Sequence, residues 1–321
     1  MLAGYITATT VDLAIARRAK GELQLFSRAS YVNADFSDLD GILKHYLKNH
    51  KLHLKGGCLG VAGPVIDNEV TATNIPWKIS GEAIAEKFSF DSIRLVNDLV
   101  ATAQGIFELP QDKFFTINKG SRKANGNLGL LAAGTGLGQA LVYYNGDKGR
   151  HYASEGGHAD FAPGNQLETE LWQYLYSEKG HVEVEDVVSL RGLVSIYDFL
   201  VDTQAGKAAD WYEKAGDKPG KIIEMALAGK DETAGHTLDV FIDCYASEAA
   251  NLALKGMTLG GIYLGGLIAP QIMTMLDKGR FMERFAKKGK MTRLLSRMPV
   301  SLIIESKTAL IGAAGLALEM D

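Results

Sequence analysis

The sequence predicts an α/β protein, and three observations lead to this class. Patterns typical of strands and of helices alternate along the chain, which indicates layers of helices packed on sheets. The chain has 321 residues, a length that suits about two domains at roughly 150 residues each. Hydrophobic residues make up 46% and charged residues 22%, which are ordinary values for a globular protein. Disordered, collagen-like and long coiled-coil structures are therefore excluded.

The first part of the chain opens with three strand patterns separated by short connections, which predicts an antiparallel meander. A helix is expected from Ser37 to Leu47, because apolar residues recur there at the spacing of one helix face. The meander covers residues 2–8, 13–17 and 23–31, and the later elements are a strand at 58–62, a helix at 80–88, a strand at 92–96 and a helix at 98–107.

The second part repeats this order as a weak echo, at the level of pattern only. Its expected strands are 127–133, 139–144, 150–153, 262–264 and 300–304, and its expected helices are 166–177, 236–254 and 307–320. Residues 202–230 are polar and are expected to form surface helices and loops. We expect a small α/β domain of residues 1–108 with 307–321, and a large α/β domain of residues 109–306.

Charge and cysteine content exclude several classes of partner. The formal net charge is −4, so no global positive field favours nucleic acid. Cys58 and Cys244 lie far apart and form no Cys-x-x-Cys pair, which excludes a disulfide framework and a thiolate zinc site and favours the reducing cytoplasm. No Lys or Arg precedes Arg17, so the basic region of a signal peptide is missing. The uncharged stretch 256–276 holds five glycines and Pro270, and predicts strand, glycine turn and helix, not a membrane span.

The most informative loop is Ala133-Gly134-Thr135-Gly136-Leu137-Gly138. Its glycines let the backbone approach a ligand, and its N–H groups can hold phosphate oxygens. A dinucleotide fingerprint would need a helix directly afterwards, but residues 139–144 are β-prone, so a strand-turn-strand phosphate clamp fits better. A hairpin turn without a ligand stays open.

A second set of glycines, Gly260-Gly261 and Gly265-Gly266, flanks the short apolar strand. These glycines allow a flat ring such as adenine to lie against the backbone. Tight packing of strand and helix explains them equally well.

Two polar segments carry residue types suited to sugar chemistry. Asn97-Asp98 lies where a strand meets a helix, and suits either an N-cap or a carboxylate that accepts a proton from a substrate hydroxyl. Glu155 and His158 flank a glycine pair, and they supply the acceptors and donors that a polyol needs. A metal site is disfavoured because the segment lacks His-Glu-x-x-His spacing, and a solvated loop stays open.

The remaining candidates carry little information alone. Asn74 and Glu185 each suit a turn residue or a surface charge as well as a ligand contact. The basic run 280–297 contains seven Lys or Arg, and in an acidic protein it predicts a solvated helix face.

Together these segments resemble the bacterial glucokinases of the hexokinase, acetate kinase and actin superfamily, through most of the chain. The segment Glu155-Gly-Gly-His158-x-Asp160-Phe-Ala-Pro163 is highly specific for that family. The absence of Cys-x-Cys zinc motifs separates the chain from the repressor-type sugar kinases. The other segments that carry the resemblance are Gly63-Pro64-Val65, Thr73-Asn74 with Trp77, Val96-Asn97-Asp98, the 133–138 loop, Gly180-His181-Val182 and residues 260–266.

The resemblance implies a two-domain actin-like ATPase fold of RNase H-like α/β domains with glucose in the cleft between them. It implies ATP-dependent phosphorylation of glucose at the start of glycolysis, with Mg²⁺ carried by the nucleotide, in a cytoplasmic homodimer. Asp98 would be the base for the 6-hydroxyl. The implied sugar ligands are Asn74, Asn97, Glu155, His158 and Glu185, and the implied nucleotide-binding residues are Thr9, Gly134, Thr135, Gly136, Gly138, Gly261, Gly265 and Gly266.

The sequence departs from the family at its first strand-turn-strand. The family pattern Asp-x-Gly-Gly-Thr is here Tyr5-Ile6-Thr7-Ala8-Thr9, so a Tyr replaces the Asp that would face Mg²⁺. Side chains at positions 7 and 8 penalise positive φ and are expected to obstruct phosphate. The usual Ser-Gly-Pro-Gly-Leu also becomes Ser189-Leu190-Arg191-Gly192-Leu193.

Two hypotheses of function follow. The first is a glucokinase, and the alternative is a catalytically impaired homologue that binds sugar in a regulatory role. The choice among glucose, mannose and an amino sugar stays open, as does the choice among ATP, ADP and polyphosphate as donor.

Overall fold

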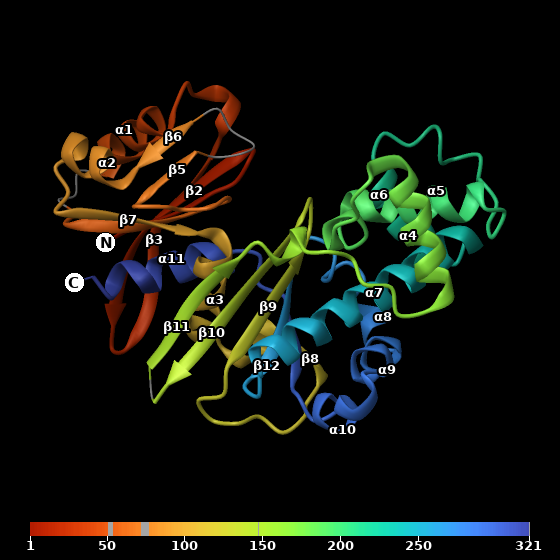
Figure 1. Ribbon diagram of the computed structural model, residues 1–321. Helices are drawn as coiled ribbons and strands as arrows, with labels where there is room; N and C mark the ends of the chain where they lie inside the picture. The colour runs from red at the N-terminus through yellow and green to blue at the C-terminus, as the bar shows by residue number, and fades with distance from the viewer. Residues whose placement is uncertain (51–53, 72–76, 147, 321) are drawn as a thin grey trace. The chain divides into compact units, whose positions relative to one another are not determined.

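The computed structural model describes residues 1–50, 54–71, 77–146 and 148–320, and the chain divides into two compact units (Figure 1). Unit 1 comprises Met1–Lys113 with Glu305–Asp321, and unit 2 comprises Phe114–Ile304. The boundaries expected at 108/109 and 306/307 lie a few residues away from these limits. As boundaries of separately folding domains, they stay predictions.

Unit 1 is built on a five-stranded sheet with the order β3-β2-β1-β4-β7. β1, β2 and β3 form the predicted antiparallel meander, and β4 and β7 continue the sheet parallel to β1. A short hairpin of β5 (Glu69–Thr71) and β6 (Lys78–Ser80) precedes the second helix. The strands of the main sheet are β1 (Leu2–Ile6), β2 (Thr10–Ala19), β3 (Glu22–Val32), β4 (Gly56–Val61) and β7 (Ser92–Asn97).

Helices cover both faces of this sheet. α1 (Leu39–His50) and α2 (Gly81–Phe88) bury their apolar residues against one face. α3 (Asp98–Glu108) and α11 (Thr308–Leu318) pack on the other face and against each other. Their close approach needs glycine, because a Cβ on Gly312 would lie 1.7 Å from the Ala101 carbonyl oxygen. Because β1, β4 and β7 are parallel, their carboxyl ends lie at the same edge of the sheet, and α3 begins at that edge.

Unit 2 has a six-stranded sheet with the order β11-β10-β9-β12-β13-β8. The five strands from β11 to β13 repeat the order and the directions of the five strands in unit 1. The weak echo in the sequence is thus a repeated sheet topology, and β8 is an additional antiparallel edge strand. The bounds are β8 (Phe114–Asn118), β9 (Leu128–Ala133), β10 (Leu137–Asn145), β11 (Lys148–Ser154), β12 (Gly261–Gly266) and β13 (Val300–Ile303).

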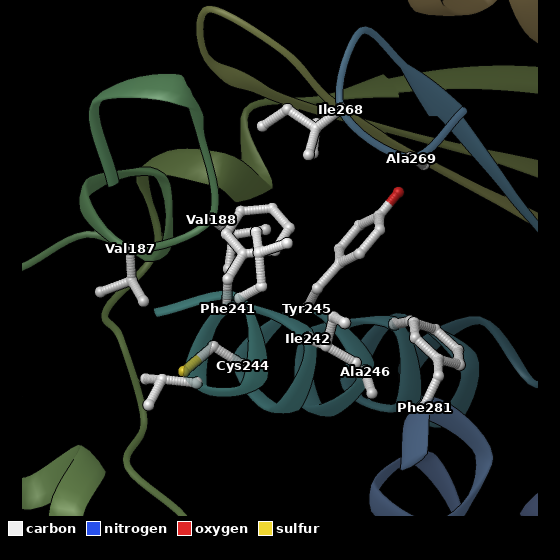
Figure 2. Close-up of a cluster of buried hydrophobic side chains, with 14 of the residues drawn as sticks. Val187, Val188, Phe241, Ile242, Cys244, Tyr245, Ala246, Ile268, Ala269 and Phe281 are labelled. Atoms are coloured by element: carbon white, nitrogen blue, oxygen red, sulfur yellow. The ribbon is translucent and has the colours of Figure 1, made fainter. Parts of the chain in front are cut away.

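The long helix α7 (Glu232–Gly256) contributes many buried side chains to the core of unit 2. Figure 2 shows Phe241 and Tyr245 projecting from α7, with Val188 beside Phe241. The buried hydroxyl of Tyr245 donates a hydrogen bond of 3.1 Å to the carbonyl oxygen of Leu131, which ties α7 to β9. The helices are α4 (Gln166–Lys179), α5 (Leu190–Asp202), α6 (Lys218–Leu227), α7 (Glu232–Gly256), α8 (Met273–Leu276), α9 (Arg280–Ala286) and α10 (Thr292–Leu295).

Five of the seven basic residues in the run 280–297 are exposed, as the sequence predicts, but Arg284 and Lys288 are not. Arg284 on α9 is only 8% exposed, and its Nη2 donates to both carboxylate oxygens of the buried Glu168. Lys288 donates to Ser247 and Asn251, and its burial, with the nearby Arg284, lowers its pKa. These two residues depart from the prediction because α9 packs against α7, which the charge count alone does not reveal.

The uncharged stretch 256–276 forms β12 and the short helix α8, as expected. Within the described residues, no helix combines the length and the apolar character needed to cross a membrane.

Candidate functional site

The turn between β9 and β10 in unit 2 has the predicted strand-turn-strand form. The Gly134 N–H donates to the Gly136 carbonyl oxygen at 2.8 Å. Among the described residues, the N–H groups of Thr135 and Gly136 have no hydrogen-bond partner within the chain. These N–H groups are therefore available to an anionic ligand such as phosphate.

The presence of glycine at positions 134 and 136 of this turn has different physical explanations. Neither residue has a positive φ. A Cβ on Gly136 would lie 2.4 Å from Oε2 of Glu185, whereas a Cβ on Gly134 would meet its nearest atom, in Leu267, at 3.5 Å. Of the two glycines, only Gly136 would bring a Cβ so close to another atom that the Glu185 carboxylate would have to shift.

Glu185 lies directly against this turn. It belongs to the 3₁₀ turn η4 (Val184–Asp186), and its side chain is 16% exposed. Oε2 accepts the Leu137 N–H at 2.8 Å, and Oε1 accepts Nη2 of Arg191 at 2.9 Å. The structure therefore joins a predicted sugar ligand to the predicted phosphate turn.

The segment that contains Glu155 and His158 is held beside η4 by its backbone. His158 ends the 3₁₀ turn η3 (Gly156–His158). The Phe161 N–H donates to the Val182 carbonyl oxygen, and the Val184 N–H donates to the Ala159 carbonyl oxygen, both at 2.9 Å. These bonds bring His158 Nδ1 within 2.9 Å of Oε2 of Glu183.

Gly157 of this segment is required by packing. A Cβ on Gly157 would lie 2.1 Å from the Leu137 carbonyl oxygen, so η3 packs directly on the start of β10. The Glu155 residue is exposed beside it.

Charge at this cluster favours a protonated imidazole. The hydrogen bond to Glu183 raises the pKa of His158, and the charges of Glu183, Glu185 and Glu155 add to this effect against some desolvation. Ligand atoms of His158, Glu183 and Glu185 lie within 4.8 Å of one another, a geometry that can hold a metal ion. However, Arg191 already supplies a cation to these carboxylates, and a protonated imidazole binds no metal. The arrangement suits polyol hydroxyls better, and the expectation of no metal ligands stays a prediction.

Glu183 and Arg191 were not predicted as site residues. The only sequence signal for Glu183 is its place two residues before Glu185, a spacing that would put both side chains on the same side of an extended strand. The 3₁₀ turn brings both carboxylates to Arg191, at 3.8 Å for Glu183 and 2.9 Å for Glu185. Arg191 stands out only as a departure from the family pattern.

The glycines of β12 lie at two different ends of the strand. Gly266 pairs with Ala133, so Gly265 and Gly266 adjoin the β9–β10 turn, and Gly138 lies in β10 opposite Ala132. Gly261 pairs with Leu128 at the other end, about 17 Å away at ~3.3 Å per residue. Its φ of +126° accounts for the glycine there. The structure thus separates Gly261 from the other predicted nucleotide-binding residues.

In unit 1, Asn97 and Asp98 lie at the carboxyl end of β7. The Asn97 Oδ1 accepts the Leu99 N–H at 2.8 Å and its Nδ2 donates to the Gly63 carbonyl oxygen, so Asn97 is the N-cap of α3. Asp98 is half-buried in the first turn of α3, and its Oδ1 also accepts the Leu99 N–H, at 3.0 Å. Asn74, the other predicted sugar ligand of unit 1, lies outside the described residues.

The altered turn between β1 and β2 is closed by a side chain. Thr7 Oγ1 accepts the N–H groups of Thr9 at 3.3 Å and Thr10 at 2.9 Å. Neither Thr7 nor Ala8 has a positive φ, so the expected backbone strain does not arise. Thr9 is exposed, but its N–H already donates to Thr7 Oγ1. This N–H is therefore not available to bind phosphate.

A carboxylate faces the altered position from the neighbouring strand. Tyr5 lies opposite Asp12 in the β1–β2 ladder, and burial, with Asp98 and Asp12 nearby, raises the pKa of Tyr5. The Oδ2 of Asp12 lies 2.8 Å from Nζ of Lys307. Of the two carboxylates near Tyr5, Asp12 is thus already paired with a lysine.

Comparisons with known proteins place these features in a family. The family model described as glucokinase matches residues 2–320. The chain belongs to the glucokinase family. A glucokinase of Trichormus variabilis is 37% identical to it, covering 98% of this chain and 97% of that protein. A glucokinase of Shigella sonnei is 30% identical, covering 97% and 95%.

Solved structures of glucokinases share the fold. A glucokinase from an Antarctic psychrotroph is 31% identical, with a TM-score of 0.87 over 99% of this chain and 98% of that chain. A glucokinase of Balamuthia mandrillaris, solved in complex with glucose, is 20% identical with a TM-score of 0.81 over 99% and 93%. The predicted α/β fold of the actin-like sugar kinases is confirmed by these glucokinases.

Proposed function

We propose that this chain is an ATP-dependent glucokinase that transfers the γ-phosphoryl group of ATP to the 6-hydroxyl of glucose. Membership of the glucokinase family supports this activity. Asp98 accepts the proton of the 6-hydroxyl as that oxygen attacks phosphorus, and ADP leaves. Glu155, His158 and Glu185 bind other sugar hydroxyls, and Asn74 and Asn97 assist them.

The observation that carries the proposal is the contact of Glu185 with the β9–β10 turn. One carboxylate oxygen of Glu185 accepts a turn N–H, beside two further N–H groups that suit phosphate oxygens. A sugar ligand and a phosphate-binding turn thus adjoin within one unit. Phosphoryl transfer depends mainly on such positioning and on charge stabilisation.

The nucleotide is assigned to the β9–β10 turn and the end of β12. The N–H groups of Thr135 and Gly136 hold its phosphates, with Gly134, Gly138, Gly265 and Gly266 around them. A ROK family glucokinase of Streptomyces griseus was solved with glucose and AMPPNP, at 18% identity and a TM-score of 0.65 over 99% of each chain, so that likeness concerns the fold alone. We leave Gly261 out of this site because it lies at the far end of β12.

Mg²⁺ is proposed to arrive with ATP, where it neutralises phosphate charge. The residues of unit 1 fit a protein-bound Mg²⁺ poorly, because Tyr5 is no carboxylate and Asp12 is paired with Lys307. No step is therefore assigned to protein ligands of the metal. A cytoplasmic location, a homodimer and glucose bound between the two units stay predictions.

The alternative, a sugar-binding protein without turnover, draws its support from the closed β1–β2 turn. An ADP-release assay with glucose and Mg·ATP, run beside calorimetric titration of glucose, separates the two functions. The proposal expects glucose-dependent ADP release that falls at least a hundredfold in Asp98→Asn, as for loss of general base catalysis at about 10²–10⁴-fold. Glucose binding with turnover no greater than that of Asp98→Asn would establish the alternative.

A further inference from the structure

His158 makes one contact that the proposed function leaves unexplained, the 2.9 Å contact between its Nδ1 and Oε2 of Glu183. The histidine side chain is 53% exposed, whereas that of Glu183 is 26% exposed. The more buried partner is thus the carboxylate. An exposed ring with one nitrogen held in this way presents its other nitrogen in a defined direction.

The position of Glu183 is fixed by several independent bonds. It is the N-cap of η4, and its N–H donates to Oδ2 of Asp186 at 3.0 Å. An isolated bridge pairs Glu183 with Asp160 on the η3 side. These bonds fix the backbone of Glu183, so its carboxylate reaches His158 from a defined point of the chain.

We propose that Glu183 is a positioning residue for glucose: it accepts the Nδ1–H of His158 and so directs Nε2 of that ring at a sugar hydroxyl. Among the described residues, Nε2 has no partner within the chain. The proposal rests on the proposed function, because it assigns His158 to the sugar. Glu183 itself touches neither the sugar nor the reacting atoms.

The surrounding charges decide which form of His158 binds. Glu155, Glu183 and Glu185 are carboxylates around the ring, and Arg191 and His181 lie 3.8 Å and 3.9 Å from Glu183. Asp160 lies 2.9 Å from His181, and Asp186 lies 3.4 Å from Arg191. The cluster already contains several acceptors for sugar hydroxyls. An Nε2–H donor complements them, and a charged donor makes the stronger hydrogen bond. Glucose should thus bind best to the imidazolium form.

This assignment predicts a particular pH dependence of glucose affinity. The bond to Glu183 raises the pKa of His158 above its ordinary value of 6.5. Glucose affinity should be highest below that raised pKa and should weaken as pH rises through it. In Glu183→Gln the ring keeps an acceptor but loses the carboxylate charge, so the weakening should begin at lower pH.

Calorimetric titration of the full chain with glucose, without nucleotide and between pH 5.5 and 8.5, tests the proposal. At pH 6.5, Glu183→Ala should weaken glucose binding about three- to tenfold, the size expected for one partly exposed hydrogen bond to a charged group. Glu183→Gln should retain most of the affinity at pH 5.5 and lose it earlier on the alkaline side. In turnover, the KM for glucose should rise while kcat stays within twofold.

Two controls keep the result interpretable. Glu170→Gln removes one exposed carboxylate from α4 of the same unit and should leave the affinity and its pH profile unchanged. In a His158→Ala background, Glu183→Ala should have no further effect, because the positioned ring is gone. A Glu183 effect that persists without His158 would mean a structural role and would overturn the proposal.

The outcomes also separate this inference from the proposed function. If the unmodified chain binds no glucose, the sugar site is refuted and Glu183 loses its role with it. Suppose instead that the unmodified chain binds glucose, and that Glu183→Ala and Glu183→Gln bind it with the same affinity and the same pH profile. The inference alone is then overturned, and the kinase activity stands.

Discussion

Gly136→Ala should separate the two glycines of the β9–β10 turn by their contacts. The new Cβ would lie 2.4 Å from Oε2 of Glu185, closer than any stable contact, so the carboxylate must move. A moved carboxylate gives up the 2.8 Å bond from the Leu137 N–H. In Gly134→Ala the new Cβ meets its nearest atom at 3.5 Å, an ordinary van der Waals distance, and nothing needs to move. The pair is thus a matched test within one turn.

The magnitude follows from the bond that is lost. A hydrogen bond to a charged group contributes about 1.5–3 kcal/mol, and the lower value applies here because the Glu185 side chain is 16% exposed. Gly136→Ala should therefore lower the free energy of unfolding by about 1.5 kcal/mol. Glucose affinity should fall about tenfold, since that ratio corresponds to ~1.4 kcal/mol and Glu185 is a proposed ligand. Gly134→Ala should change stability by less than about 1 kcal/mol, and upward, because alanine restricts the unfolded chain.

Urea denaturation and calorimetric titration of glucose measure both quantities on the same variants. The two variants should differ in stability and in glucose affinity. Gly136→Ala should be the less stable of the two and should bind glucose less tightly. Equal values for the two variants would show that the contact of Glu185 with this turn is not what requires the glycine. A loss of stability in Gly136→Ala without any loss of glucose affinity would remove Glu185 from the sugar site.

Three further predictions concern other parts of the chain. Arg284→Met leaves Glu168 buried without its partner and should lower the free energy of unfolding by about 3–5 kcal/mol in urea, whereas a loss below about 1 kcal/mol would contradict a buried pair. Burial raises the pKa of Asp186, but the bonds from Lys179 and a backbone N–H outweigh it, so the pKa lies below 3.8. The stability that Asp186 contributes is therefore complete above pH 3.8 and lost as pH falls through the lowered pKa, and Asp186→Asn should flatten the acid limb of thermal unfolding. Thr7→Ala should raise the affinity for Mg·ATP severalfold in calorimetry, because it frees two N–H groups, and an unchanged affinity would show that this turn does not contact the nucleotide.

Local periodicity predicted most of the fold, because the spacing of apolar residues reflects which face of an element is buried. The meander of unit 1 and the helices α1 and α7 follow directly from it. α5 was missed: it begins at Leu190, inside the segment that departs from the family pattern Ser-Gly-Pro-Gly-Leu. β8 was missed because it is a half-buried edge strand without a clear alternation.

Side-chain partners that lie far apart along the chain could not be predicted from the sequence. The charge of Arg284 predicts an exposed side chain unless one knows that Glu168, 116 residues earlier, is buried beside it. The bond between Glu183 and His158 likewise joins residues that are 25 positions apart. Composition and spacing identify such residues as chemically suitable, but only the packing of η3 on η4 brings them together. Sequence therefore identifies chemically suitable residues for the candidate site, but not the residues that hold them in place.

The repeated sheet topology explains why the β1–β2 turn was misjudged. This turn and the β9–β10 turn join equivalent strands, and neither contains a positive φ at the compared glycine positions or their replacements. Missing glycines therefore do not impair the first turn through backbone strain. The two turns differ in whether their N–H groups are already hydrogen-bonded. In the β1–β2 turn Thr7 Oγ1 accepts two N–H groups, whereas in the β9–β10 turn those of Thr135 and Gly136 stay available. The hydroxyl of Thr7, and not its Cβ, is then the obstacle, so Thr7→Ala should raise nucleotide affinity as much as Thr7→Gly does. A gain in Thr7→Gly alone would return the obstacle to the Cβ.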